Sequence, residues 1–167
     1  VLVNVFDPNS CQLVYNRVFA NNADDFTVSS LLGIQLGSVS NPTQAAGSNL
    51  ANYSLLSETV GTSLLGLTGE TSQTVRWNTM VPAGTPVTIK LGREYGVAGV
   101  AGGIYVQAAN DDNLLGVRQI ADANLVSAIN GVNEFEYTFI PTDAVGVPVA
   151  YNSIKISLRS LLNAVQN

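Results

Sequence analysis

Glu134 and Glu136 are the pair of carboxylates in this chain whose spacing best fits acid-base chemistry. Two residues apart on one strand, their side chains would share a face and could approach the separation that glycosidases use. Their neighbours Phe135, Tyr137 and Phe139 form the apolar half of the same alternating pattern. Because the polar side of such a strand normally faces water, we predict solvated surface carboxylates here, with a hydrolase as the alternative.

Two further acidic clusters, Asp24-Asp25 and Asp111-Asp112-Asn113, fall where the chain is expected to turn. Aspartate and asparagine favour turns because their side chains bond the neighbouring backbone. The second cluster is predicted to close a hairpin-like loop that begins at Asn110. A calcium loop is the alternative for either cluster, since Ca²⁺ binds carboxylate and amide oxygens.

Histidine is absent from the 167 residues, and only 11% of them are charged. Without imidazole there is no Ser-His-Asp or Cys-His unit, and the commonest metal ligand is missing. A serine-lysine pair would need Lys90 or Lys155, and both alternate with apolar residues and should face water. The glycine-rich segment 96–103 lacks the lysine of a phosphate-binding loop. We therefore expect no enzyme, no catalytic residue and no cofactor.

The composition also limits the partners. The net charge is −5 and the seven basic residues are scattered, so nucleic acid is not an expected partner. No run approaches the roughly 18 apolar residues of a membrane helix, so we expect no membrane insertion. The length predicts a single domain over residues 1–167. The single cysteine, Cys11, is expected in the core, with a link to another chain as the alternative.

Short apolar runs separated by Gly, Pro and Asn predict an all-β fold, an antiparallel jelly-roll-like β-sandwich with short helical turns. The segment Phe26–Gly37 fits either a short helix near Ser29–Leu36 or a strand, and a second helical turn is expected at Asp122–Ile129. Trp77 alternates in phase with Val75 and is predicted to lie in the core. The expected strands are Val1–Phe6, Gln12–Ala20, Tyr53–Gly61, Gln73–Asn78, Val87–Leu91, Ile104–Ala108, Leu114–Ile120, Glu134–Ile140 and Ser153–Arg159.

One long segment carries a family resemblance. Leu31–Glu58 reads LLGIQLGSVSNPTQAAGSNLANYSLLSE. This segment resembles a loop of the jelly-roll modules in bacterial surface proteins exported by the type IX route, and of galactose-binding-like sandwiches. Later segments such as SQTVRWN, VPAGTPVTIKLG and YNSIKISLRSLL resemble successive strands of that module. The resemblance covers about residues 30–165 and implies an extracellular location on a bacterial cell surface.

The same resemblance implies a candidate metal site, and the aromatic residues near loops separately suggest a sugar site. In such folds this loop often holds a structural calcium, but the family's Asp-Gly pair is Ala46-Gly47 here. Ser48, Asn49 and Asn52 would supply only neutral oxygens, and a calcium bound by them is the alternative to no metal. For a glycan, the predicted contacts are the ring of Tyr95 and the neighbouring Arg93.

The first residues form an unusual strand, because Val1, Leu2, Val3, Val5 and Phe6 make it apolar on both faces. Such an edge would aggregate if it were left exposed. In the family, a further apolar strand usually follows the point where this chain ends. We therefore interpret residues 1–10 as a candidate strand donated to a neighbouring copy. The alternatives are one repeat of a longer polymer and pairing within the chain's own sandwich.

The sequence thus predicts a non-enzymatic extracellular structural or adhesive module. Its expected partners are copies of itself, assembled into a filament or repeat array, and a glycan or surface polymer is a further candidate. A carbohydrate-binding module is the alternative function.

Overall fold

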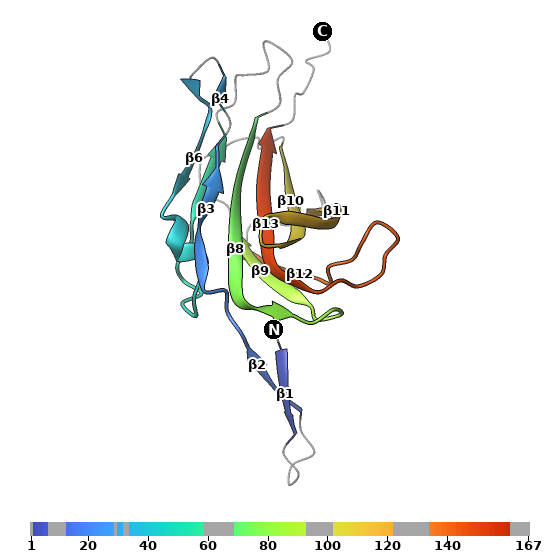
Figure 1. Ribbon diagram of the computed structural model, residues 1–167. Helices are drawn as coiled ribbons and strands as arrows, with labels where there is room; N and C mark the ends of the chain where they lie inside the picture. Colours follow the sequence, from blue (N-terminus) through green and yellow to red (C-terminus); the bar gives the residue numbers. More distant parts are fainter. Residues whose placement is uncertain are drawn as a thin grey trace.

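The computed structural model describes residues 2–6, 13–28, 30–31, 34–58, 69–92, 102–121 and 134–160. These residues form an antiparallel β-sandwich (Figure 1), which confirms the predicted all-β class. The larger sheet has the strand order β11-β10-β13-β8-β3. Its strands are β3 (Asn22–Thr27), β8 (Glu70–Val81), β10 (Gly102–Asn110), β11 (Asn113–Ala121) and β13 (Tyr151–Ser160).

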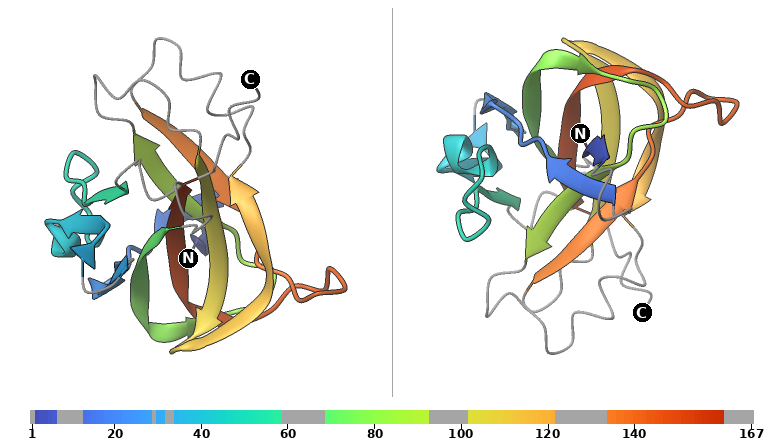
Figure 2. Two further views of the ribbon diagram at one scale, coloured as in Figure 1. Left: turned by 90° about the horizontal axis from the view of Figure 1, so that it is seen from above. Right: turned by 90° about the horizontal axis from the view of Figure 1, so that it is seen from below.

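Shorter antiparallel pairs complete the sandwich. They are β9 (Val87–Gly92) with β12 (Glu134–Phe139), β6 (Gly37–Ser40) with β7 (Leu55–Glu58), and β4 (Ser30–Leu31) with β5 (Ile34–Gln35). Viewed along the strands, the larger sheet is strongly curved (Figure 2). This curvature brings strands that do not pair with each other toward one another.

The core lies between the larger sheet and the β9-β12 pair. Val75 and Ile154 are register partners on β8 and β13, and they share one buried cluster with Val87 of β9 and Phe139 of β12. Trp77 is 8% exposed, as predicted for a core residue. Val75 and Trp77 on β8 and Ile154 on β13 are thus buried, as the period-2 pattern requires.

Gln73 is a buried polar residue in this core, with 1% exposure. Its Nε2 donates to the carbonyl oxygens of Ala23 at 2.5 Å and Pro42 at 2.6 Å, and its Oε1 accepts from the hydroxyl of Ser54. A buried amide without partners would be costly. Gln73 therefore ties β8 to β3 and to the short 3₁₀ helix Pro42–Ala45.

Two local predictions were wrong. Asp24-Asp25 lies in strand β3 and not in a turn, because Asp25 pairs with Thr74 of β8 and Ala23 fills the core. The sequence also predicts a long loop at Ser38–Asn52, around Pro42 and Gly47, but the first residues of this segment belong to β6. Around Ser29–Leu36 the described residues form β4 and β5, so the strand alternative is correct there. The helical turn predicted at Asp122–Ile129 lies outside the described residues.

The first strand, β1 (Leu2–Phe6), pairs with β2 (Leu13–Arg17) as an antiparallel hairpin. This hairpin forms a two-stranded sheet of its own and extends away from the sandwich (Figure 1). Pairing within the chain therefore occurs, but with β2 and not with a strand of the larger sheet. Val1 and residues 7–12, which include Cys11, lie outside the described part of the chain.

Candidate functional site

Polar side chains cover the side of the larger sheet that points away from the core. Strand register places them in four rows across β8, β13 and β10, and these residues are called the outer face below. The rows are Arg76-Ser153-Ala109, Thr74-Lys155-Gln107, Ser72-Ser157-Tyr105 and Glu70-Arg159-Gly103.

Small side chains make this face hollow. Ser72, Ser153, Ser157 and Ala109 are all 3% exposed or less, although they point away from the core. The side chain of Lys155 is 28% exposed, so it is more covered than its place on an outward phase predicts. The face is therefore a partly enclosed surface and not a simple solvated one.

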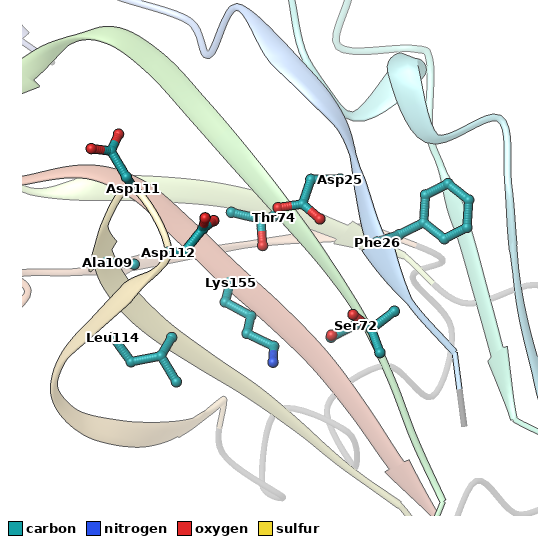
Figure 3. Close-up of a pocket in the computed structure, with 10 residues that line it drawn as sticks. Asp25, Phe26, Ser72, Thr74, Ala109, Asp111, Asp112, Leu114 and Lys155 are labelled. Carbon is teal, nitrogen blue, oxygen red and sulfur yellow. The ribbon is translucent and has the colours of Figure 1, made fainter. Parts of the chain in front are cut away.

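A cleft of about 240 Å³ opens on this face (Figure 3). Ser72, Thr74 and Lys155 lie on the central strands β8 and β13, and β3 and the β10-β11 hairpin form the two sides. The side residues are Asp25, Phe26 and Thr27 from β3 and Ala109, Asp111, Asp112 and Leu114 from the hairpin. The ring of Phe26 points away from Lys155 (Figure 3), so the cleft presents mainly hydroxyl, carboxylate and ammonium groups.

Arg76 holds the two sides of the cleft together. Its Nη2 lies 2.5 Å from Asp25 Oδ2 on β3 and 2.7 Å from Asp112 Oδ1 at the hairpin turn. Hydrogen bonds to Asp112 and Asp25 raise the pKa of Arg76 above its ordinary value. Both carboxylates are thus engaged in ion pairs with one guanidinium.

The hairpin turn is itself fixed to β13. Asp111 adopts a positive φ of 53°, which aspartate tolerates better than most residues. Its Oδ1 accepts a 2.7 Å hydrogen bond from Asn152 Nδ2, and its backbone oxygen accepts one from the Ser153 hydroxyl at 3.0 Å. The predicted hairpin loop is confirmed, and its two carboxylates bond to different partners.

A second polar cluster lies at the other end of the outer face, around Glu70. Arg118 Nη2 donates to Glu70 Oε1 at 2.7 Å, and Arg159 Nε donates to Oε2 at 2.6 Å. The Ser157 hydroxyl donates to Oε1 at 2.9 Å, and Lys155 Nζ lies 3.8 Å from the same oxygen. One carboxylate therefore faces three cations, which we call the Glu70 cluster.

The Glu70 cluster keeps its carboxylate ionised. Partial burial raises the pKa of Glu70, but hydrogen bonds from Arg118, Arg159 and Ser157 lower it by more, so that the pKa falls from 4.5 to about 2. A carboxyl group with this pKa holds no proton at neutral pH. It therefore cannot act as a general acid there.

Tyr105 adds an aromatic ring to this cluster. The guanidinium carbons of Arg118 and Arg159 lie 5.1 and 5.5 Å from the ring centroid, within the range of cation-π attraction. The ring extends over Gly103, where an added Cβ would come within 2.7 Å of it. The glycine thus leaves the space that the ring occupies.

A β-bulge sets the position of Arg118 along this face. The pairing of β10 with β11 passes from Val106↔Gln119 to Ala108↔Leu115, so β11 carries extra residues over this stretch. Gly116 sits in the bulge with a φ of 62°, and its carbonyl accepts a 3.0 Å hydrogen bond from Gln107 Nε2. Two extra residues keep the alternation of the strand, so the bulge moves Arg118 along β11 without changing its face.

Of the residues singled out from the sequence, Asp25, Asp111, Asp112 and Lys155 line the cleft. Glu136 is exposed on β12 and lies 3.9 Å from Arg17, as a surface carboxylate should, and the side chain of Glu134 is not described. Tyr95 and Arg93, the predicted glycan contacts, fall outside the described residues. Four residues of the predicted donor segment lie in β1, namely Leu2, Val3, Val5 and Phe6, and Val1 is outside the described residues.

Ser48, Asn49 and Asn52 are all exposed, in the loop after the 3₁₀ helix. The Oδ1 of Asn49 accepts a 3.1 Å hydrogen bond from the backbone of Ala51. Over the described ranges, no three His, Cys, Asp or Glu side chains gather into a metal-binding group. Calcium at these three residues stays a prediction.

Sequence reasoning missed the outer face as a site. It treated Lys155 and Arg159 as separate surface charges, since the alternation of β13 predicts only that they point outward. Glu70 lies 89 positions from Arg159 along the chain, and no local pattern connects them. The available signal was the placement of four basic residues, Arg76, Arg118, Lys155 and Arg159, on expected strands.

No protein-family model, curated protein or solved structure matches this chain. In the part of the chain that is described, no helix is long and apolar enough to cross a bilayer.

Proposed function

We propose that this chain is a non-enzymatic extracellular adhesive module that binds a polysaccharide through the outer face of its larger sheet. The observation that carries the proposal is the cleft of about 240 Å³ on that face. Pockets that enclose whole drug-sized molecules measure about 300–1,000 Å³. A smaller open cleft suits one ring of a longer ligand that continues along the sheet.

The chemistry of the cleft supports a ligand rich in hydroxyl groups. Ser72 and Thr74 offer hydroxyls that donate and accept, Asp25 offers acceptors, and Lys155 offers donors. Both hydrogen-bonding roles are therefore present within one partly covered surface. Polar groups that converge in this way fix the orientation of a polar ligand and give specificity.

A binding role fits this arrangement better than catalysis. Asp25 and Asp112 are both paired with Arg76, and Glu70 is held as an anion by its neighbours. General acid-base catalysis needs a group that exchanges a proton near the working pH. The resemblance of Leu31–Glu58 to type IX surface modules supports the extracellular location.

The test is a pair of matched substitutions. Thr74→Tyr fills the floor of the cleft, and Thr88→Tyr makes the same change on β9, where Thr88 is exposed and outside the cleft. We expect the wild-type chain and Thr88→Tyr to bind the same polysaccharides on a glycan array and in affinity electrophoresis. Thr74→Tyr should lose that binding while keeping its melting temperature. Equal binding by all three proteins would refute the proposal.

Self-association is a second candidate, favoured by the β1-β2 hairpin. A two-stranded hairpin is marginally stable alone, and this one stands apart from the sandwich (Figure 1). Strands β11 and β3 end the larger sheet, and such terminal strands can accept a strand from another chain. We propose that the hairpin, including residues 1–10, adds to a second copy.

Sedimentation of the intact chain and of a chain lacking residues 1–10 tests this candidate. We expect concentration-dependent assemblies from the intact chain and monomers from the shortened one. Val5→Lys, which places a charge on the same strand, should also give monomers. An unchanged assembly state after the deletion would rule out a role for the hairpin.

A further inference from the structure

The charge on the outer face is unevenly distributed. Four of the seven basic residues, Arg76, Arg118, Lys155 and Arg159, lie on this side of the larger sheet. Arg76 is matched by Asp25 and Asp112. In the described part of the chain, the other three pair with Glu70 and with no second carboxylate. The described residues at that end therefore carry an excess of positive charge, on a chain whose net charge is −5.

We infer that the Glu70 cluster is a subsite for an anionic group, so that the ligand of the outer face is an acidic polysaccharide bearing carboxylates or sulfate esters. This inference rests on the proposed polysaccharide-binding function and names the class of ligand. Lys155 connects the two parts of the site, because it lines the cleft and also lies 3.8 Å from Glu70. One chain of sugars can therefore reach both.

Arg118 and Arg159 have further N–H groups that can donate to an incoming anion. A guanidinium carries five N–H groups in a rigid fork, and Glu70 accepts from Nη2 of Arg118 and Nε of Arg159. The side chain of Arg159 is 43% exposed and that of Arg118 is 24% exposed. The ring of Tyr105 orients both guanidinium groups before the ligand arrives, which reduces the ordering cost of binding.

An ion-pair network that only stabilises the fold would have the same geometry, but it predicts different effects of substitutions on ligand binding. If the cluster serves stability alone, Glu70→Gln weakens the fold and leaves ligand binding unchanged. If the cluster binds anions, Glu70 is the internal anion that competes with the ligand. Its neutralisation then tightens binding of acidic polymers although the fold is less stable.

The experiment compares matched charged and neutral polymers by calorimetry at low salt. Polygalacturonate is compared with its full methyl ester, and dextran sulfate with dextran, so that carboxylate and sulfate recognition are separated. We expect at least one acidic polymer to bind about tenfold or more tightly than its neutral partner, since charge-assisted hydrogen bonds are the stronger ones. The preference should shrink as salt rises.

Three variants then locate the effect. Lys155→Met should weaken binding of the acidic polymer about tenfold, since one charged contact is lost. Glu70→Gln should strengthen it. Arg17→Gln removes the same charge from an exposed residue that pairs with Glu136 outside the outer face, and should change nothing. Because Lys155 is the most distant of the three cations from Glu70, its removal should leave folding intact.

The outcomes separate the two proposals. Equal affinity for charged and neutral polymers, with binding lost in Thr74→Tyr, would overturn the anionic subsite and leave the proposed function standing. An acidic preference that Arg17→Gln reduces as much as Lys155→Met would also overturn the subsite, because the effect would then be one of overall charge. If no acidic polymer binds, the anionic subsite is refuted, and the proposed function is then tested by the binding of neutral glycans alone.

Discussion

Replacing Glu70 by glutamine removes the carboxylate on which three cations converge while keeping the size of the side chain. The ionised form is favoured in the folded chain, where the pKa is about 2 against an ordinary value of 4.5. This difference corresponds to about 3 kcal/mol of stability at neutral pH. Because the side chain is 24% exposed, solvent screening reduces the expected loss to about 1.5 kcal/mol.

The sign of the pH dependence follows from the lowered pKa. The contribution of Glu70 is fully present above its ordinary pKa of 4.5 and is lost as the pH falls toward about 2. Wild-type stability should therefore decline over that interval through this group. The Gln variant lacks this component, so the difference between the two proteins should shrink as the pH falls.

Urea denaturation at a series of pH values from 7 to 2 measures this difference. At pH 7 the melting temperature of Glu70→Gln should also lie about 3–6 °C below that of wild type, as a loss of this size implies for a domain of this length. Glu136→Gln is the matched control, because Glu136 lies 3.9 Å from Arg17 at an exposed site, and it should show no measurable change. A Glu70→Gln deficit that is independent of pH would refute the ionic account of the cluster.

Three further substitutions test other parts of the structure. Gly116→Ala should destabilise the fold by about 3 kcal/mol in urea, because a Cβ there would meet the Thr142 carbonyl oxygen at 1.7 Å on a positive-φ backbone. Burial raises the pKa of Tyr151 to about 12, so between pH 10 and 12 this group ionises in the unfolded chain but not in the folded one, and the wild type loses stability. Tyr151→Phe should lose less stability over that interval, as measured by denaturation curves at alkaline pH. Gly103→Ala should displace the ring of Tyr105, seen as shifted aromatic NMR signals, at a small cost in stability.

The sequence was sufficient for the fold class and for the phase of the long strands. On β13 the alternation of Ile154 and Ile156 with Lys155 correctly predicted which side chains face the core. Periodicity identifies a face but not its curvature, so it could not show that Lys155 lies in a hollow. The strand at Asp24-Asp25 was missed because its polar composition is typical of turns, whereas Arg76 on β8 stabilises it across the sheet.

The candidate site was beyond sequence reasoning for a related reason. Strand order in a sheet depends on contacts that form between distant segments. Glu70, Arg118 and Arg159 meet only because β8 and β10 both pair with β13 and the bulge at Gly116 sets the register of β11. Tyr95, the aromatic residue expected to contact a glycan, lies outside the described residues, and among the described residues Tyr105 adds a ring to the outer face.

The central claim is that a polysaccharide binds across the outer face of the larger sheet. The most direct measurement is an NMR titration of the labelled chain with short oligogalacturonates, following the amide signals of all strands. The account predicts that shifts concentrate on β8, β10 and β13 near Thr74, Lys155 and Tyr105, while β9 and β12 stay unchanged. Saturable shifts confined to another surface, or no shifts with any acidic or neutral oligosaccharide, would contradict it.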